Sequence, residues 1–410
     1  MKRKKELTIL GIETSCDDTG IALLKIKKNK KKTVFETLSN IVASQIKIHK
    51  KYGGVYPSLA KREHQKNLIP IFKKSLKQAN LLKKFQPQNE KDQKILNSKI
   101  IILEKILKRE KELFEELKKF LEKYKKPKIN AIAVTVGPGL EPCLWVGINF
   151  AKALAFFWNL PLITINHIEA HILINFLYQN IQFPISKKTL KEIFPAISLI
   201  VSGGHTQLIL LKDIGKYRLI GETRDDAAGE CFDKCARILG LGYPGGPEIS
   251  ISASKKTTEN LEIKLPRPMI YTKDYDFSFS GLKTAVLYKI KKAKSKIKNK
   301  NYISAMSKEI QQAIIDVLIK KTIKSAKDYK TKTIILAGGV SANNELRFQL
   351  TKKAKEKKIK IFIPPKKLST DNALMVALAG YFNYNKKIKV LNKFPYFEKK
   401  IEAKGNLKIK

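Results

Sequence analysis

Two stretches far apart in the chain share one plan. Residues 6–26 read ELTILGIETSCDDTGIALLKI, and residues 194–214 read FPAISLIVSGGHTQLILLKDI. Each is an apolar run, a turn of small and polar residues, and a second apolar run, which predicts two antiparallel strands joined by a tight turn. Such turns expose backbone N–H groups and hydroxyls that suit phosphate, although each could also be an ordinary hairpin turn. The repetition favours a duplicated α/β architecture with a nucleotide between the halves.

Three further glycine-rich turns support this prediction. Residues 131–140 (AIAVTVGPGL) predict a buried strand and a Gly-Pro-Gly turn, with a helix from about Cys143. Residues 333–347 (TIILAGGVSANNELR) predict a strand, a glycine pair and a helix that opens near Asn343, and residues 242–247 (GYPGGP) predict a tight, exposed turn. Because ligands of α/β proteins gather at strand ends, several such turns favour a ligand site there.

Length and composition limit the class of protein. A chain of 410 residues suits two domains, because single cores rarely grow past roughly 250–300 residues. No apolar run reaches the roughly 18–20 residues that a membrane span needs, so we expect no membrane association. The four cysteines include no CxxC pair, which favours a reducing, cytoplasmic location over a disulfide framework.

The chain is strongly basic. Lys and Arg number 82 against 36 Asp and Glu, which gives a formal net charge of +46. Such a surface attracts polyanions, and RNA is the first candidate. Nearly all of the basic residues are Lys, however, and Ile and Asn are also abundant. A compositionally biased genome therefore explains the charge equally well.

Residues 84–126 differ from their surroundings. Apolar side chains there recur at alternating spacings of four and three, interrupted at Glu110: Leu96, Ile100, Leu103, Leu107, Phe114, Leu117, Leu121 and Tyr124. The pattern predicts one long helix or a helical hairpin with an apolar stripe. Packing against the chain's own body is favoured over a partner coiled coil. We expect a surface appendage that metal and nucleotide binding do not need.

Residues 164–171, TINHIEAH, hold His167 and His171 one helical turn apart, so both imidazoles should share a helix face. This spacing fits either a structural pair or a metal site. Zinc proteases use H-E-x-x-H, in which the Glu follows the first His directly. Here Glu169 lies two residues after His167, about 200° around a helix, so it should face away from the histidines. A metallopeptidase is therefore a weak alternative.

Taken together, the motifs resemble one family, the TsaD-type tRNA adenosine threonylcarbamoyltransferases, formerly described as O-sialoglycoprotein endopeptidases. They stand in family order over almost the whole chain: GIETSCDDTGIA, YGGVYPSLAKREH, VGPGL, NHIEAH, LIVSGGHTQL, DDAAGECFDKCARILGLGYPGGP, PRPM, DFSFSGLKT, AGGVSANNELR and STDNALM. The resemblance implies the duplicated actin/Hsp70/sugar-kinase (ASKHA) fold, with nucleotide and metal in the cleft between two lobes. We expect lobes at 1–190 and 191–410, the last helices returning to the first lobe. Residues 84–126 look like an insertion where the family usually has a short connection.

The resemblance also answers the question of the histidine pair. In the family, two histidines of NHIEAH and the aspartate of STDNA bind one metal ion, which assigns His167, His171 and Asp371 here. Two imidazoles and a carboxylate leave coordination positions open for substrate. The family often has His where this chain has Asn166. Iron(II) is the expected ion, and zinc is the alternative.

The implied reaction moves a threonylcarbamoyl group from threonylcarbamoyl-AMP to N6 of the adenosine next to the anticodon, in tRNAs that read codons beginning with adenine. AMP is released. The metal would act as a Lewis acid on the acyl carbonyl. Asp17, which lies with Asp18 in the first turn, is the candidate catalytic residue, and a loop-capping role is the alternative for both. The resemblance assigns donor binding to Ile200, Val201, Ser202, Gly203, Gly204, Asp233, Gly246 and Asn343.

The family resemblance also implies partners and leaves rival functions open. We expect tRNA, the adenylate donor, and companion proteins like TsaB and TsaE. Arg267 in PRPM and Lys283 in FSGLKT face either a phosphate region or surface ion pairs. The main alternative is a non-catalytic nucleotide-binding scaffold of the same fold, which would keep the glycine loops and lose the metal triad. An ATP-driven kinase or chaperone also shares the fold.

Overall fold

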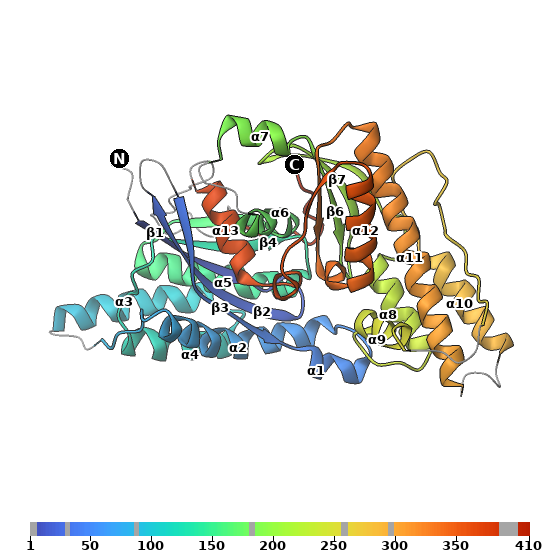
Figure 1. Cartoon of the computed structure of the whole chain (residues 1–410). Coiled ribbons are helices and arrows are strands. Elements are labelled where there is room, and N and C mark those ends of the chain that lie inside the picture. The colour runs from blue at the N-terminus through green and yellow to red at the C-terminus, as the bar shows by residue number, and fades with distance from the viewer. Residues whose placement is uncertain are drawn as a thin grey trace. The chain divides into compact units, whose positions relative to one another are not determined.

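The computed structural model describes residues 6–28, 33–85, 90–179, 185–255, 261–293, 299–384 and 401–410. The chain forms two compact units (Figure 1). Unit 1 contains Met1–Gln45, Val55–Pro184 and Asp371–Lys408, and unit 2 contains Ile46–Gly54, Ile185–Thr370 and Ile409–Lys410. Neither unit is continuous in sequence, because the chain leaves unit 1 after Gln45 and returns to it at Val55 and again at Asp371.

Unit 1 is built on a five-stranded sheet with the order β3-β2-β1-β4-β5. Its first three strands are antiparallel neighbours, whereas β4 runs parallel to β1 and β5 runs parallel to β4. The strands are β1 (Glu6–Glu13), β2 (Asp18–Lys28), β3 (Thr33–Ser44), β4 (Ala131–Gly137) and β5 (Leu162–Asn166).

Unit 2 repeats this sheet. Its order is β8-β7-β6-β9-β10, with β6, β7 and β8 antiparallel and β9 and β10 added in parallel. The strands are β6 (Ala196–Val201), β7 (Thr206–Asp213), β8 (Lys216–Glu222), β9 (Thr333–Ala337) and β10 (Lys360–Phe362). Both stretches that share a plan in the sequence form the first hairpin of a sheet, so the prediction of a duplicated α/β fold is confirmed.

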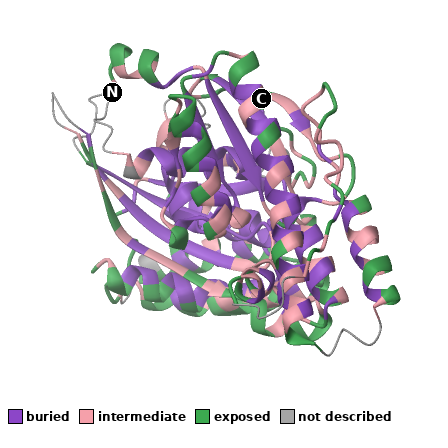
Figure 2. Ribbon diagram, turned by 45° about the vertical axis from the view of Figure 1, so that its right-hand side comes forward, coloured by how far each residue is buried: buried purple, intermediate pink, exposed green. Residues whose placement is uncertain are grey.

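Helices cover both faces of the unit 1 sheet. Helices α2 (Pro57–Gln78) and α5 (Glu141–Trp158) pack on one face, and α13 (Ala373–Asn383) packs on the other beside α6 (His167–Leu173). A short 3-10 helix, η2 (Ile174–Tyr178), follows α6. Gly11 allows α13 to lie close to β1, because a Cβ there would come within 2.2 Å of the Ala373 carbonyl oxygen. Strands β1, β2 and β4 between these layers are almost wholly buried, whereas the edge strand β3 is mostly half-buried or exposed (Figure 2).

Unit 2 has its own apolar core, made by its sheet with α8, α10, α11 and α12. Its α-helices are α1 (Ile46–His49), α7 (Lys187–Ile193), α8 (Ala228–Ile238), α9 (Gly245–Ala253), α10 (Ser280–Lys292), α11 (Lys300–Asp328) and α12 (Asn344–Glu356). Its 3-10 helices are η1 (Lys50–Tyr52), η4 (Gly339–Ala342) and η5 (Lys366–Leu368). The helix predicted near Asn343 is therefore confirmed as α12.

The apolar stripe in residues 84–126 forms a helical hairpin, α3 (Glu90–Ile106) and α4 (Lys111–Lys123). The hairpin packs on α2 and α5 and joins the core of unit 1, as predicted for packing on the chain's own body. Its ends meet again, since the Phe85 N–H donates to the Lys123 carbonyl and the Lys125 N–H to the Lys83 carbonyl. Glu110, which interrupts the apolar stripe, lies between the two helices and is buried. Its carboxylate accepts a hydrogen bond from the Asn149 side chain at 3.0 Å.

The GYPGGP stretch differs from its prediction as a wholly exposed turn. Helix α9 begins inside it at Gly245, and Gly245 is buried. A Cβ at this position would lie 2.6 Å from the Asp233 Cα atom, so only glycine lets α9 start against α8. The local pattern of glycine and proline carried no information about this helix contact.

Candidate active site

Helix α6 begins with a side-chain cap. Asn166, at the end of β5, accepts hydrogen bonds from the N–H groups of Ile168 at 2.9 Å and Glu169 at 3.1 Å through its side-chain oxygen. An Asn cap satisfies N–H groups that have no partner inside the helix. Asn166 thus acts in this structure as the residue that fixes the first turn of α6, which carries His167.

The structure brings the three predicted metal-binding residues together. His167 and His171 lie one turn apart on α6, with ring centroids 4.6 Å from each other, and Asp371 lies just before α13. The Asp371 Oδ1 atom is 3.0 Å from His171 Nε2 and 3.5 Å from His167 Nε2. Residues 200 positions apart therefore present two nitrogens and one oxygen to a common point.

The donor set fits a metal ion. One ligand atom from each of the three residues lies within 4.8 Å of the others. Two ligand atoms at about 2.1 Å from a tetrahedral metal are roughly 3.4 Å apart, close to both nitrogen–oxygen distances here. Imidazole and carboxylate together suit zinc and iron(II). The group could therefore hold a divalent cation.

The first turn of unit 1 supports this group. Glu13, the last residue of β1, and Ser15 both contact His167 Nδ1, at 3.3 Å through Glu13 Oε2 and 3.2 Å through Ser15 Oγ. Burial alone would raise the pKa of Glu13, but the charge and hydrogen bond of His167 lower it below its ordinary value. Burial would lower the pKa of His167, but Asp371 and Glu13 raise it to about 9.

Asp17 and Asp18 occupy the same turn. Burial raises the pKa of Asp18 to about 7, and the charge of Asp371 adds to the rise. The Asp17 carbonyl accepts the N–H of Gln45, which ties the turn to the end of β3. On the other side, His64 of α2 hydrogen-bonds Thr19 Oγ1 at 2.8 Å and the Cys16 carbonyl at 2.9 Å. This turn is thus held at both of its ends.

The predicted donor loop lies in unit 2. Ile200 and Val201 belong to β6 and pair with β7, and the Ser202 N–H donates to the His205 carbonyl at 2.8 Å. Gly203 and Gly204 form the exposed tip, where a Cβ would meet nothing within 4 Å. Within the predicted donor loop, Ile200 and Val201 are buried and Ser202 is half-buried, so only Gly203 and Gly204 are exposed to solvent.

The three other predicted donor residues lie within α8 (Asp233), in the first turn of α9 (Gly246) and just before α12 (Asn343). From the middle of α8, Asp233 accepts the N–H of Gly245, the first residue of α9, at 2.7 Å, and burial raises the pKa of its carboxyl group. Asn343 caps α12 by accepting the Leu346 N–H at 3.0 Å, and it donates to Gln311 at 2.8 Å. Around Gly246 there is open space, the nearest atom to an added Cβ being Phe232 Cβ at 4.0 Å.

Several charged residues have structural partners. Arg267 donates to Asp316 at 2.9 Å and also contacts Glu309, so its guanidinium belongs to an ion-pair cluster. Lys283 is half-buried on α10. Glu169 is buried and accepts a hydrogen bond from Asn383 of α13 at 3.1 Å, and it is not part of the group of possible metal ligands.

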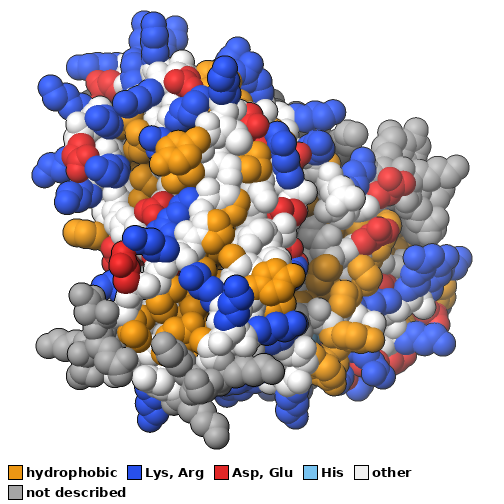
Figure 3. Space-filling view, turned by 90° about the vertical axis from the view of Figure 1, so that its right-hand side faces the viewer, with side chains coloured by type: hydrophobic (Ala, Val, Ile, Leu, Met, Phe, Trp, Pro, Cys, Tyr) orange, Lys and Arg blue, Asp and Glu red, His pale blue; other side chains and the backbone are white. Residues whose placement is uncertain are grey.

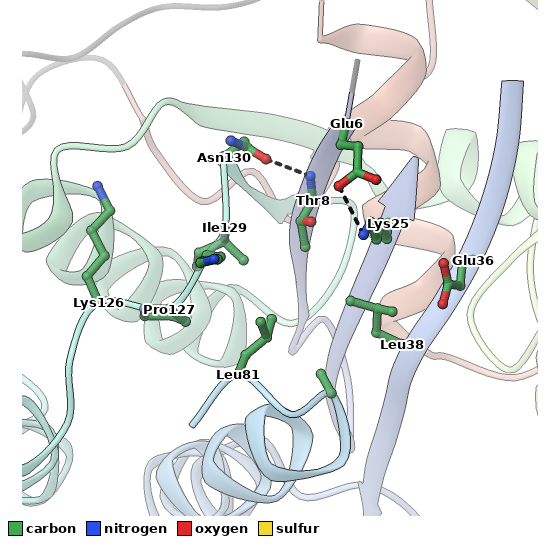
Figure 4. A pocket seen from close by; sticks show the side chains of 12 residues that line it. Glu6, Thr8, Lys25, Glu36, Leu38, Leu81, Lys126, Pro127, Ile129 and Asn130 are labelled. Carbon is green, nitrogen blue, oxygen red and sulfur yellow. Dashed lines mark hydrogen bonds and ion pairs between the residues drawn. The ribbon is translucent and has the colours of Figure 1, made fainter. Parts of the chain in front are cut away.

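A cavity of about 670 Å³ lies elsewhere in unit 1 (Figure 4). Its wall contains Glu6 and Thr8 at the start of β1, whereas Glu13 lies at the end of that strand. Four polar residues of this wall are already engaged in two pairs: Glu6 with Lys25 at 3.0 Å, and the Thr8 N–H with Asn130 Oδ1 at 2.8 Å, while Glu36 pairs with Lys27 outside the lining. The cavity therefore offers a ligand no convergent set of polar groups like that at His167.

Lys and Arg side chains are spread over the face drawn in Figure 3 instead of gathering in one patch. This distribution fits both a polyanion partner and a general compositional bias. In the part of the chain that the structure describes, no helix combines the length and apolarity needed to cross a membrane.

Sequence reasoning missed the residues that support the metal group. The sequence predicts only strands and turns around Glu13, Ser15 and Thr135, and at Asn166 it shows only a departure from the His that the family often has. The signal available was the run of polar residues directly after an apolar strand, GIETS. It could not reveal that their partner lies more than 150 positions away.

Comparisons with known proteins show the family of this chain. Residues 36–85 and 105–378 match the family TsaD, tRNA N6-adenosine threonylcarbamoyltransferase. The segment outside the match, 86–104, is shorter than the 84–126 expected for an insertion, and α4 lies inside the matched range.

Two curated relatives are both named tRNA N6-adenosine threonylcarbamoyltransferase. The protein of Thermosipho africanus (strain TCF52B) is 43% identical over 98% of this chain and 100% of its own length. That of Bacillus subtilis (strain 168) is 39% identical over 95% of this chain and 94% of its own. A solved structure, full-length HypF in the phosphate- and nucleotide-bound form, is 13% identical with a TM-score of 0.48, over 95% of this chain and 48% of that chain. The sequence matches show that this chain belongs to the TsaD family of tRNA N6-adenosine threonylcarbamoyltransferases, which makes it an acyltransferase.

Proposed function

We propose that this chain transfers the threonylcarbamoyl group of threonylcarbamoyl-AMP to N6 of the adenosine adjacent to the anticodon, in tRNAs that read codons beginning with adenine. The N6 amine attacks the carbamoyl carbon, the bond from that carbon to the phosphate oxygen breaks, and AMP leaves with its electron pair. The amine gives up a proton in the same exchange. The observation that carries the proposal is the convergence of His167, His171 and Asp371 in a member of this family.

The three residues are proposed to hold one divalent cation, iron(II) in the first place and zinc as the alternative. When bound, such an ion acts as a Lewis acid toward the carbonyl oxygen of the donor. The residues around it do the positioning. Asn166 fixes the start of α6, and Glu13 and Ser15 hold the ring of His167. Asp17 lies in the adjoining turn and is the proposed catalytic residue.

The AMP part of the donor is assigned to unit 2. The exposed tip of Gly203 and Gly204 lets a phosphate approach backbone N–H groups closely, because no side chain stands in the way. Asp233 keeps acceptor capacity beyond its bond to Gly245, since a carboxylate has two oxygens, and ribose hydroxyls are its proposed partners. Gly246 and Asn343 would border the adenosine, and Ile200, Val201 and Ser202 provide the strand end on which the tip stands.

The chain is proposed to work in the cytoplasm with companion proteins like TsaB and TsaE, while a separate enzyme supplies the adenylate. A non-catalytic scaffold is the less favoured alternative, because the metal-ligand set is complete. A metallopeptidase would need a general base beside the metal. The carboxylate of Glu169, the residue nearest in sequence, is instead bonded to Asn383.

The test is an assay of the purified chain with unmodified tRNA, threonylcarbamoyl-AMP and the companion proteins, followed by mass spectrometry of the tRNA nucleosides. We expect threonylcarbamoyladenosine with the wild-type chain, and at least about 100-fold less with Asp371→Ala or His171→Ala. Glu169→Gln is the matched control and should retain most activity. Modification that is undiminished in both ligand variants would contradict the proposed role of the metal group.

A further inference from the structure

Glu13 has an unusual position for a charged residue. Its side chain is completely buried at the end of β1, between β2 and β4. A buried carboxylate is costly unless donors surround it. Here the Ser15 N–H donates to Oε1 at 2.7 Å and the Thr135 hydroxyl donates to Oε2 at 2.7 Å. Both donors are fixed parts of the sheet and its first turn, so the carboxylate has one orientation.

The remaining partner of Glu13 is His167, whose Nδ1 atom lies 3.3 Å from Oε2. A carboxylate oxygen without a proton can only accept, so the nitrogen that faces it carries the hydrogen. Ser15 Oγ, 3.2 Å from the same Nδ1 atom, is a second acceptor. In the neutral ring, a hydrogen on Nδ1 leaves the lone pair on Nε2. The Nε2 atom is the one that faces Asp371, at 3.5 Å.

The turn that presents Ser15 is itself braced. The Leu140 N–H donates to the Ser15 carbonyl at 2.7 Å, and a Cβ on Gly139 would lie only 2.5 Å from that oxygen. Gly139 has φ of +154°, a region that side-chain-bearing residues rarely adopt. The Gly-Pro-Gly turn after β4 and the polar turn after β1 therefore hold each other, and through them the ring of His167.

We propose that Glu13 is a positioning residue of the metal centre. It accepts the Nδ1 hydrogen of His167 and so directs Nε2 toward a cation shared with His171 and Asp371. The inference rests on the metal site of the proposed function and adds a residue to it that touches neither metal nor substrate. Hydrogen-bond partners of this kind fix the tautomer and the ring orientation of a metal-binding histidine.

The experiment measures zinc affinity by competition with a chelator, in the purified full-length chain and its variants. Glu13→Gln has nearly the same shape but cannot accept from Ser15, Thr135 and His167 at once, because one oxygen becomes an NH₂ group. We expect its zinc dissociation constant to rise about 10–100-fold. Thr135→Val, which removes one donor to Glu13 and leaves the carboxylate in place, should have a smaller effect in the same direction.

Glu169→Gln is the matched control. Glu169 is also a buried carboxylate, it lies on α6 between the two histidines, and its hydrogen-bond partner is Asn383. Its variant should bind zinc within about threefold of the wild type, a change near RT in free energy. Thermal unfolding of each variant, measured without metal, separates a loss of affinity from a general loss of structure.

A second readout reports the hydrogen on Nδ1 directly. The chain has five histidines, so labelling them with ¹⁵N gives a small set of signals that single substitutions can assign. In the zinc-loaded protein His167 should show an Nδ1–H group in a strong hydrogen bond, and that proton signal should move upfield in Glu13→Gln. A role confined to stability would leave the signal of the folded variant unchanged.

The outcomes are distinct. Equal zinc affinity in the wild type and Glu13→Gln would overturn the positioning role while leaving the proposed metal site intact. Equal losses in Glu13→Gln and Glu169→Gln would also overturn it, since the effect would then belong to the helix as a whole. A wild-type chain that binds neither zinc nor iron(II) would overturn both the inference and the metal site on which it rests.

Discussion

At the scale of single residues, the chemistry of this chain gathers around His167. Its Nδ1 atom faces the Glu13 carboxylate and its Nε2 atom faces that of Asp371. Two carboxylates around one ring favour a positive charge there, and this is why the pKa of His167 is raised to about 9 despite burial. A proton and a metal cation therefore compete for the same place.

This competition predicts a pH dependence for the metal. His167 must lose a proton before it can bind a cation, so the apparent zinc affinity should rise about tenfold for each pH unit between pH 6 and 8. The metal-free chain should show the opposite trend. The stability that protonated His167 contributes is complete below its ordinary pKa of 6.5 and is lost as pH rises through about 9.

Chelator competition across this pH range tests the first trend, and denaturant unfolding of the metal-free chain tests the second. His167→Asn, which does not titrate, is the control for the second trend and should flatten it; as it lacks a proposed metal ligand, it should bind zinc much more weakly at every pH. An affinity that is constant from pH 6 to 8 in the wild type would show that His167 is not protonated when the metal is absent.

Residue by residue, the sequence predicted the ligands better than their support. Helical spacing predicts only that His167 and His171 share a helix face, and the family resemblance implies that these two and Asp371 bind a metal. The contacts of Glu13, Ser15 and Thr135 depend on β1 and β4 being neighbours, which no local pattern reveals. Asp233 and Asn343 were predicted to bind a ligand, and in the structure each also accepts an N–H group from the first turn of a helix. A side chain that can bind a hydroxyl can equally bind a helix N–H group.

At the scale of elements, the proposed donor loop ends in a glycine tip that a ligand can approach closely. A Cβ at Gly204 meets nothing within 4 Å, so Gly204→Val should fold like the wild type. Its branched methyl groups would cover the backbone N–H groups at the tip. Losing two such hydrogen bonds, at about 1 kcal/mol each, predicts roughly thirtyfold weaker binding of AMP.

Calorimetry with AMP measures this change. Gly281→Val is the matched control, because Gly281 is also exposed, with Pro268 Cγ at 3.9 Å as the nearest atom to an added Cβ. It lies at the start of α10, outside the loop, and should bind AMP normally. If Gly204→Val binds AMP as tightly as the wild type, the turn is only a hairpin connection.

The α3–α4 hairpin packs on its own unit, as expected for residues 84–126, and it is also part of the unit 1 core; that metal and nucleotide binding do not need it stays a prediction. Its apolar face is part of the unit 1 core, and Phe120 packs on Phe72 with ring centroids 5.2 Å apart. Heptad spacing correctly predicted the buried face. The spacing could not show what this face packs against. In the structure α4 packs on α2 and α3 packs on α5.

Phe120→Ala should therefore destabilise unit 1 by about 3–5 kcal/mol, through lost apolar contacts and the cavity left behind. The zinc affinity of the folded variant should be unchanged, because α6 and α13 lie on the other face of the sheet. Ile101→Ala, at a side chain that is 56% exposed on α3, is the control and should change the stability by less than about 0.5 kcal/mol. Urea unfolding followed by fluorescence measures both. Equal, small effects would mean that the hairpin is loosely attached.

At the scale of the whole molecule, one strand plan occurs twice, with the order β3-β2-β1-β4-β5 in unit 1 and β8-β7-β6-β9-β10 in unit 2. Sequence comparison of the two hairpins predicted the duplication, because hydrophobic runs and turn residues are local signals. Local signals do not show which unit a segment joins. Residues Ile46–Gly54 belong to unit 2 and Asp371–Lys408 to unit 1, and only long-range packing determines that.

The residues of the proposed site are divided between the two units, which leads to the last prediction. The proposed metal-binding group lies wholly in unit 1, and the proposed donor-binding residues, the glycine tip with Asp233 and Asn343, lie wholly in unit 2. A ligand that binds only the folded state stabilises what it binds, by about 2.7 kcal/mol at a hundred times its dissociation constant. Zinc alone should therefore slow amide hydrogen exchange in α6 and at the start of α13. AMP alone should slow it at residues 202–204 and at the starts of α9 and α12.

Hydrogen exchange read by mass spectrometry distinguishes these regions in a single sample. His171→Ala should abolish the protection by zinc and keep the protection by AMP, and Gly204→Val should do the reverse, so that each variant is the control for the other. Protection by AMP that appears in α6 and is absent from the glycine tip would contradict the assignment of the adenylate to unit 2. Protection by zinc in both units of the His171→Ala variant would instead reveal a cation site other than the one formed by His167, His171 and Asp371.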